Sequence, residues 1–233
     1  MTAILVLGCC LVASATTPRH AASPNHMTAP IRLIVIGDSL STGYQTPGNP
    51  WTDEAQAMFD ASGQDVEIVN AAENGAGYVS RGANGDNFRD EADMVVDARA
   101  DVVLVFGSDN DLGQTGVARA AASTLARIRS LTPHATVIVV GPPAPPAASP
   151  SSLAAIRDDL RTSAQQAGAQ FVDALEAKWF QGSDAQFTGP DGEHPNASGA
   201  LYLADKMVAI LAPAVARQTQ LSPGAPQAAG PTK

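Results

Sequence analysis

Five short runs rich in apolar and β-branched residues alternate along the chain with segments of helical periodicity. The strand-like runs lie at residues 31–36, 66–70, 102–106, 136–140 and 171–173. Four of the five are continuous apolar stretches, which is typical of strands buried on both faces. Strands that alternate with helices favour parallel pairing, because each helix returns the chain to the same edge of the sheet. The sequence therefore predicts an α/β fold with a central parallel sheet of about five strands.

The segments between these runs carry helix signals. Asn49-Pro50 offers an N-cap followed by proline at the first helical position, and Gly63 ends that helix. Apolar residues at helical spacing predict further helices within residues 88–100, 117–131, 153–164 and 201–211. A glycine-rich loop is expected at residues 71–87.

Composition limits the possible partners. The chain has 233 residues, 45% hydrophobic and 16% charged, which fits one globular domain that we place at residues 31–212. The formal net charge of −9, without a cluster of Lys or Arg, argues against a nucleic-acid partner, which requires a basic face. We expect a monomer. The only cysteines, Cys9 and Cys10, lie near the N-terminus, so a chain that has lost this segment contains neither a thiol nucleophile nor cysteine-ligated zinc.

Both ends of the chain are expected to lie outside the domain. Residues 1–15 combine an apolar run with Ala13-Ser14-Ala15, a small-x-small cleavage pattern. This predicts a signal peptide, a location outside the cell or in its envelope, and no transmembrane helix in the mature protein. No Lys or Arg precedes the run, so the alternative is a cytoplasmic protein that starts at Met27. Residues 16–30 are predicted to be a linker and residues 213–233 a disordered tail rich in Pro and Ala.

Chemistry-bearing residues follow four of the predicted strands. Loops that leave the carboxyl ends of parallel strands meet at one edge of the sheet. The loops after the first, second, third and fifth strands carry Ser39, Gly75, Asn110 and the segment 191–196. They supply a serine, backbone amides beside glycine, an asparagine amide and an Asp-x-x-His pair. These groups are a nucleophile, oxyanion donors, a base and a group that orients the base, which together favour acyl transfer.

Position distinguishes one histidine from the other three. His20 and His26 fall in the leader and the linker, and His134 lies between a helix and the fourth strand, at the opposite edge of the sheet. His194 alone is placed to serve Ser39. Taken alone, Ser39 is an ordinary turn or N-cap serine. The pairing of the two residues favours the catalytic interpretation.

Four segments in this order resemble the conserved blocks of the SGNH (GDSL) hydrolases. They are Gly37-Asp38-Ser39-Leu40, 70–75, 107–111 and 191–196. The resemblance extends from about Ile31 to Leu211 and implies a flavodoxin-like three-layer α/β/α sandwich. It also implies a reaction that needs no organic cofactor and no metal.

The resemblance assigns roles to individual residues. Ser39 matches the nucleophile, His194 the base and Asp191 the acid that orients the base. The backbone N–H groups of Ser39 and Gly75 and the side-chain amide of Asn110 match the oxyanion hole.

The chain departs from the family pattern in two places. Gly77 is an alternative to Gly75 in the second block, and Gly75 is chosen by its distance from Asn70. In the third block two residues separate Gly107 from Asn110, where the family commonly has one. Asp38 and Asp111 are expected to hold loops through bonds to the backbone.

The leading hypothesis is a serine esterase that hydrolyses a carboxylic ester of a small molecule, a lipid or an acylated sugar through an acyl-enzyme. The same triad would serve an O-acyltransferase or deacetylase acting on cell-envelope carbohydrate. The scaffold could also belong to a non-catalytic envelope-binding protein. Acyl-chain length and the alcohol depend on loops at 77–87, 142–150 and 177–190, whose shapes the sequence does not define.

Overall fold

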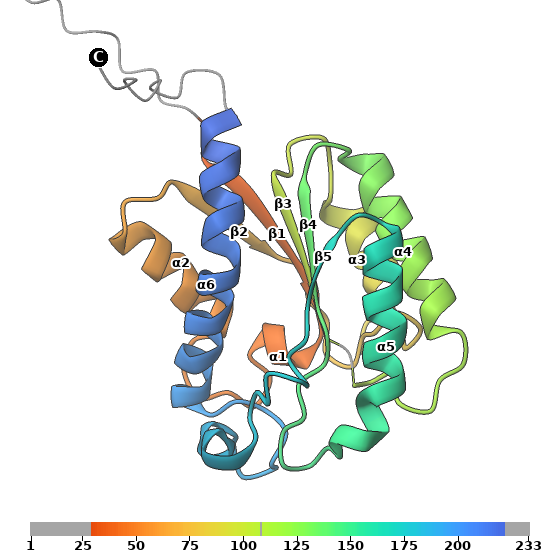
Figure 1. The fold of residues 1–233 in the computed structure, drawn as a ribbon. Coiled ribbons are helices and arrows are strands. Elements are labelled where there is room, and N and C mark those ends of the chain that lie inside the picture. Colours follow the sequence, from red (N-terminus) through yellow and green to blue (C-terminus); the bar gives the residue numbers. More distant parts are fainter. Residues whose placement is uncertain (1–28, 108, 222–233) are drawn as a thin grey trace, which may run out of the picture.

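A five-stranded sheet forms the centre of the molecule (Figure 1). The computed structural model describes residues 29–107 and 109–221. The strands are paired in parallel in the order β2-β1-β3-β4-β5, the flavodoxin-like order. They are β1 (Ile31–Gly37), β2 (Val66–Asn70), β3 (Val102–Phe106), β4 (Thr136–Val140) and β5 (Gln170–Val172). The predicted α/β fold and parallel sheet are confirmed, with each strand boundary within one residue of its expected place.

Seven helical segments connect and follow these strands in the described part of the chain. They are α1 (Ser39–Thr42), α2 (Trp51–Ala61), α3 (Phe88–Val95), α4 (Val117–Leu131), α5 (Pro150–Gln166), the 3-10 helix η1 (Gly182–Phe187) and α6 (Ala197–Leu221). Helix α2 begins one residue later than expected, because Pro50 itself is the N-cap, in an extended conformation. Helix α3 ends at Val95 rather than near residue 100, because Val96 is extended and the next turn is held by Asp97.

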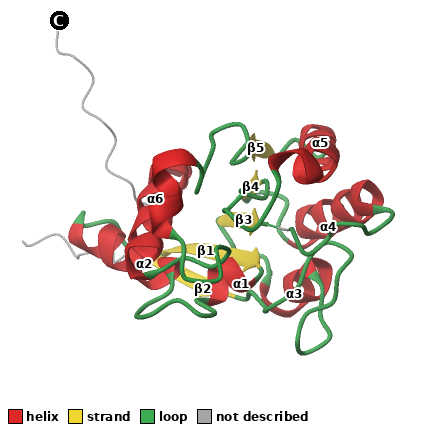
Figure 2. Cartoon of the chain, turned by 90° about the horizontal axis from the view of Figure 1, so that it is seen from below, coloured by secondary structure: helices red, strands yellow, loops and turns green. Residues whose placement is uncertain are grey.

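The strand side chains alternate between two apolar layers. Ile34 and Ile36 of β1 pack with α3, α4 and α5, whereas Leu33 and Val35 pack with α2 and α6. Figure 2 shows the two groups of helices on opposite sides of the sheet. All four side chains are fully buried. Because both faces are covered, the strands consist of continuous apolar runs rather than alternating ones.

The C-terminal helix is longer than expected. The predicted disordered tail from residue 213 is wrong over its first part, because α6 continues through Pro213 to Leu221. Proline removes a helical N–H and normally ends a helix. Here Ala214 and Val215 beyond it are buried in the apolar layer that α2 and α6 form on one face of the sheet. The Gln218 amide also donates to Thr136 Oγ1 (3.2 Å). This burial offsets the lost hydrogen bond.

Helix α6 is also long and apolar enough to cross a membrane by length and composition. Its buried residues lie in the apolar layer that packs against the sheet and α2. The predicted signal peptide (1–15), most of the linker (16–30) and the end of the tail (222–233) lie outside the described residues, and these assignments stay predictions.

Candidate active site

Ser39 is the first residue of the short helix α1, directly after β1. Asp38 caps this helix, because its Oδ1 accepts the Leu40 N–H (2.9 Å) and its carbonyl accepts the Ser41 N–H (2.9 Å). Gly43 ends the helix with φ +80°, a left-handed conformation that favours glycine. The Gly-Asp-Ser-Leu stretch therefore holds Ser39 at the carboxyl end of β1, half-buried and facing a cleft.

The Asp-x-x-His segment forms a tight loop before α6. The Asp191 Oδ1 accepts the backbone N–H groups of Glu193 (3.0 Å) and His194 (3.1 Å). The His194 carbonyl in turn accepts the Gly189 N–H (2.7 Å), which closes the loop. Gly192 has φ +71°, so the turn needs a residue without a Cβ. Two backbone bonds thus fix the carboxylate before it meets the imidazole.

The three predicted residues form one continuous chain of hydrogen bonds. The His194 Nδ1–H donates to Asp191 Oδ2 over 2.7 Å, and the His194 Nε2 lies 3.0 Å from the Ser39 Oγ. With the proton on Nδ1, the Nε2 lone pair can accept the serine hydroxyl proton. The His194 side chain is buried. Its ring packs edge-to-face against the Tyr44 ring, with the two ring centroids 5.0 Å apart. The structure therefore brings together the serine, histidine and aspartate that the sequence singled out.

The charge of Asp191 suits this arrangement. Partial burial acts to raise the pKa of its carboxyl, but the bonds from the Glu193 and His194 backbone and from the imidazole outweigh it and lower the pKa below the ordinary value. The carboxylate is ionised at neutral pH, so it can stabilise a positive charge that develops on His194.

The three expected oxyanion donors lie around the same cleft. No acceptor within the described ranges engages the backbone N–H of Ser39 or of Gly75. Gly75 has φ +78°, which points to a backbone position that only glycine adopts easily. The Asn110 amide donates one N–H to the Ala76 carbonyl (2.9 Å), and an NH₂ group carries a second donor. Asn110 therefore lines the cleft despite the longer spacing from Gly107.

Asp111 joins the second and third blocks. Its carboxylate accepts three successive backbone N–H groups, those of Tyr78, Val79 and Ser80, at 2.8 to 3.0 Å. A Cβ on Gly77 would lie 2.6 Å from the Asp111 Oδ1, so the loop also requires glycine there. The structural role expected for Asp111 is confirmed. Glycine at position 77 allows the Asp111 carboxylate to lie close to the backbone.

Two buried carboxyl groups adjoin the segment from Gly37 to Ser39. Glu91 of α3 accepts the Gly37 N–H through Oε2 (3.0 Å), and burial raises its pKa to about 9. Burial, followed by the charge of Asp109, also raises the pKa of Asp38 well above its ordinary value. Asp38 Oδ2 and Glu91 Oε1 have no hydrogen-bond partner in the described structure. A Cβ on Gly107 (φ +125°) would lie 2.4 Å from the Asp38 Oδ2. Only glycine at this position leaves enough space for the Asp38 carboxyl group.

A cleft of about 370 Å³ opens over the Ser39 hydroxyl. It is lined by Ser39, Tyr44, Asn74, Gly75, Ala83, Asn110, Glu193 and His194. Sequence reasoning missed four of them, namely Tyr44, Asn74, Ala83 and Glu193. Asn74 and Glu193 adjoin predicted site residues in the chain, and that adjacency could have indicated them. In the described residues no group of three or more His, Cys, Asp or Glu side chains could hold a metal ion.

The sequence pattern of the GDSL-like Lipase/Acylhydrolase family matches residues 35–201, which include all the residues of this cleft. The chain belongs to this family. It is 36% identical over 187 residues to the GDSL lipase Rv0518 of Mycobacterium tuberculosis, a match that covers 77% of this chain and 80% of the relative. The chain is therefore a hydrolase that acts on ester bonds.

Solved structures share the fold of this GDSL hydrolase. TesA is similar with a TM-score of 0.64 and 22% identity, over 78% of this chain and 99% of TesA. The psychrotrophic esterase EstA from Pseudoalteromonas sp. gives a TM-score of 0.64 and 18% identity, over 78% of this chain and 97% of EstA. The expected three-layer sandwich is thus the fold of known esterases.

Proposed function

We propose that this GDSL hydrolase is a serine esterase that uses Ser39, His194 and Asp191 as its catalytic triad. The observation that carries the proposal is the unbroken chain from the Ser39 Oγ through the imidazole to the Asp191 carboxylate, with contacts of 3.0 and 2.7 Å. A serine hydroxyl is a weak nucleophile until a neighbouring base accepts its proton. This base is buried and held by a carboxylate, which favours a catalytic over a merely structural serine.

The reaction follows from these contacts. The Ser39 Oγ attacks the ester carbonyl carbon while its proton passes to the His194 Nε2, which forms a tetrahedral intermediate. The imidazolium, stabilised by Asp191, returns the proton to the leaving alcohol as the carbon–oxygen bond breaks. Water then attacks the acyl-enzyme with His194 again as base, and releases the acid and free Ser39.

The negative oxygen of each tetrahedral intermediate needs donors. The N–H groups of Ser39 and Gly75 and the second N–H of the Asn110 amide are suited to this task. An Asn110→Ala variant is expected to lower kcat by roughly 10²–10³ with little change in KM, because an oxyanion donor acts mainly in the transition state. Steady-state kinetics of the folded variant measure this. An unchanged kcat would remove Asn110 from the mechanism.

A chain-length series of p-nitrophenyl esters tests the function as a whole. The wild-type protein should hydrolyse at least part of the series, and Ser39→Ala should be inactive on all of it while keeping its fold. The dependence of kcat/KM on acyl length then reports the depth of the acyl site. A Ser39→Ala protein as active as the wild type would overturn the proposal.

A further inference from the structure

A second cavity of about 370 Å³ lies between the starts of α3 and α4. It shares no residue with the catalytic cleft. Its lining contains hydroxyl, amide and guanidinium groups from Tyr78, Asn87, Arg89, Arg119, Ser123 and Thr124, and no Asp or Glu. A wall rich in donors and free of carboxylates suits an anion better than a cation or an apolar group.

Two hydroxyl groups at this cavity lack partners. Tyr78 is 2% exposed and Thr124 0% exposed, yet the Tyr78 OH and the Thr124 Oγ1 make no hydrogen bond in the described structure. Burial also raises the pKa of Tyr78, so its hydroxyl keeps its proton and can donate. A buried polar group without a partner is costly, and a bound ligand or an ordered water would supply the missing hydrogen bond. Both residues line the cavity, so an acceptor bound deep in it is a candidate partner for these hydroxyls.

The cavity also holds unpaired positive charge. Six arginines form ion pairs: Arg32, Arg81, Arg99, Arg127, Arg157 and Arg161. Arg129 donates to backbone carbonyls. Among the described residues this leaves Arg89, Arg119 and Arg217 without a carboxylate or carbonyl partner, and two of these three line one cavity. In a chain of net charge −9, such a pairing is notable.

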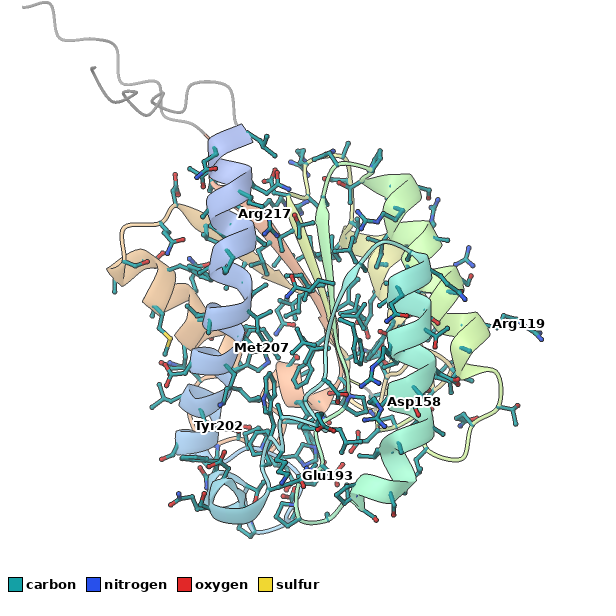
Figure 3. All side chains as sticks on the ribbon, viewed as in Figure 1. Arg119, Asp158, Glu193, Tyr202, Met207 and Arg217 are labelled. Atoms are coloured by element: carbon teal, nitrogen blue, oxygen red, sulfur yellow. The ribbon has the colours of Figure 1, made fainter. Side chains whose placement is uncertain are left out.

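Both arginines line the same cavity. The Arg89 guanidinium donates to the Oγ of Ser123, which also lines the cavity (2.5 Å). Figure 3 shows Arg119 extending into solvent from the first turns of α4. Arg119 is exposed here, so a ligand in the cavity would be contacted after a change of its rotamer.

The start of α4 adds a further favourable field. Gly116 is its N-cap and supplies no side-chain acceptor, and the first turn contains no acidic residue. The positive end of the helix dipole is therefore uncompensated beside the cavity.

We propose that this cavity binds a tetrahedral oxyanion, the phosphate group of a phosphomonoester or of a lipid headgroup, between Arg89, Arg119 and the hydroxyls of Tyr78 and Thr124. The site is separate from the proposed catalysis. Tyr78 connects it to the expected oxyanion donors, because Tyr78 follows Gly75 by three residues and its backbone N–H donates to Asp111, the neighbour of Asn110 (2.8 Å).

Calorimetric titration with inorganic phosphate tests the proposal, with sodium chloride as the ionic-strength control. Three variants are compared: the double variant Arg89→Gln/Arg119→Gln, Tyr78→Phe, and Arg217→Gln as a matched control that removes an unpaired arginine elsewhere. Tyr78→Phe removes only the hydroxyl and keeps the ring contact with Phe88. Circular dichroism and melting in chloride establish that each variant is folded.

The wild type and Arg217→Gln should bind phosphate alike, and the double variant should bind at least about tenfold more weakly, the loss expected for charge-assisted hydrogen bonds. Tyr78→Phe should show a smaller loss. Glycerol 3-phosphate and vesicles of phosphatidic acid, against phosphatidylcholine, distinguish a soluble phosphomonoester from a lipid headgroup. No binding of any phosphate compound at about 10 mM, or equal binding by the double variant, would overturn the proposal.

Discussion

Replacing Glu91 by glutamine should change how the stability of this esterase depends on pH. Glu91 is fully buried in α3 and accepts the Gly37 N–H, and burial raises its pKa from 4.5 to about 9. Between these values the folded protein keeps the Glu91 proton and the unfolded chain loses it. Because the folded state then binds more protons, the free energy of unfolding falls as pH rises through this range.

The size of this pH dependence follows from a difference of one bound proton between the folded and unfolded states. Each pH unit between the two values lowers the free energy of unfolding by ~1.4 kcal/mol, so Glu91 costs roughly 3 kcal/mol of stability at pH 7. The glutamine side chain of the Glu91→Gln variant cannot titrate and keeps an acceptor for the Gly37 N–H. Its NH₂ group replaces the unpartnered Oε1, which adds a pH-independent cost of about 1–3 kcal/mol.

Urea denaturation of both proteins between about pH 5 and pH 8 measures these two effects separately. Glu91→Gln should be less stable than the wild type at the acid end and more stable at the alkaline end, with a crossing near about pH 6. Asp38 also has a raised pKa and its charge acts on Glu91, so the difference between the two proteins reports the titration of Glu91 together with its coupling to Asp38. Parallel stability curves for the two proteins would refute the inference that Glu91 is held neutral.

Two further changes test the supports of the site and the fold. Asp111→Ala leaves the backbone N–H groups of residues 78–80 without their acceptor, so it should cost at least about 3 kcal/mol of unfolding free energy and lower kcat, as urea denaturation and ester kinetics would show. If the free energy of unfolding of Asp111→Ala equals that of the wild type, the Asp111 carboxylate is not needed to stabilise residues 78–80. Removal of residues 213–233 should lower the melting temperature by several degrees, because Ala214, Val215 and Gln218 are buried, whereas removal of 222–233 alone should not. Equal melting of the two truncated proteins would contradict the packing role of the last turns of α6.

Sequence patterns sufficed to predict the sheet and the proximity of Ser39, His194 and Asp191, because each depends on a strong local signal. Continuous apolar runs such as 102–106 have few alternatives to a buried strand. Parallel strands place their carboxyl ends at one edge, which brought Ser39 and His194 together although 155 positions separate them.

Features that depend on tertiary packing could not be predicted from the sequence. Pro213 signals the end of a helix, and only the buried residues beyond it keep α6 intact. Glu91 appears in the sequence as an ordinary polar residue in the first turn of a helix, and its contact with Gly37 lies 54 positions away. Tyr44 reaches the catalytic cleft through the shape of the loop after α1, which no periodicity encodes.

Covalent labelling tests the central claim most directly, namely that His194 activates Ser39. A fluorophosphonate probe should add one adduct per molecule on the peptide that contains Ser39, by mass spectrometry of the digested protein. Ser39→Ala should not label, and folded His194→Ala should label at least about 10³-fold more slowly, because the serine has lost its base. An adduct on another residue, or labelling of His194→Ala at the wild-type rate, would contradict the account.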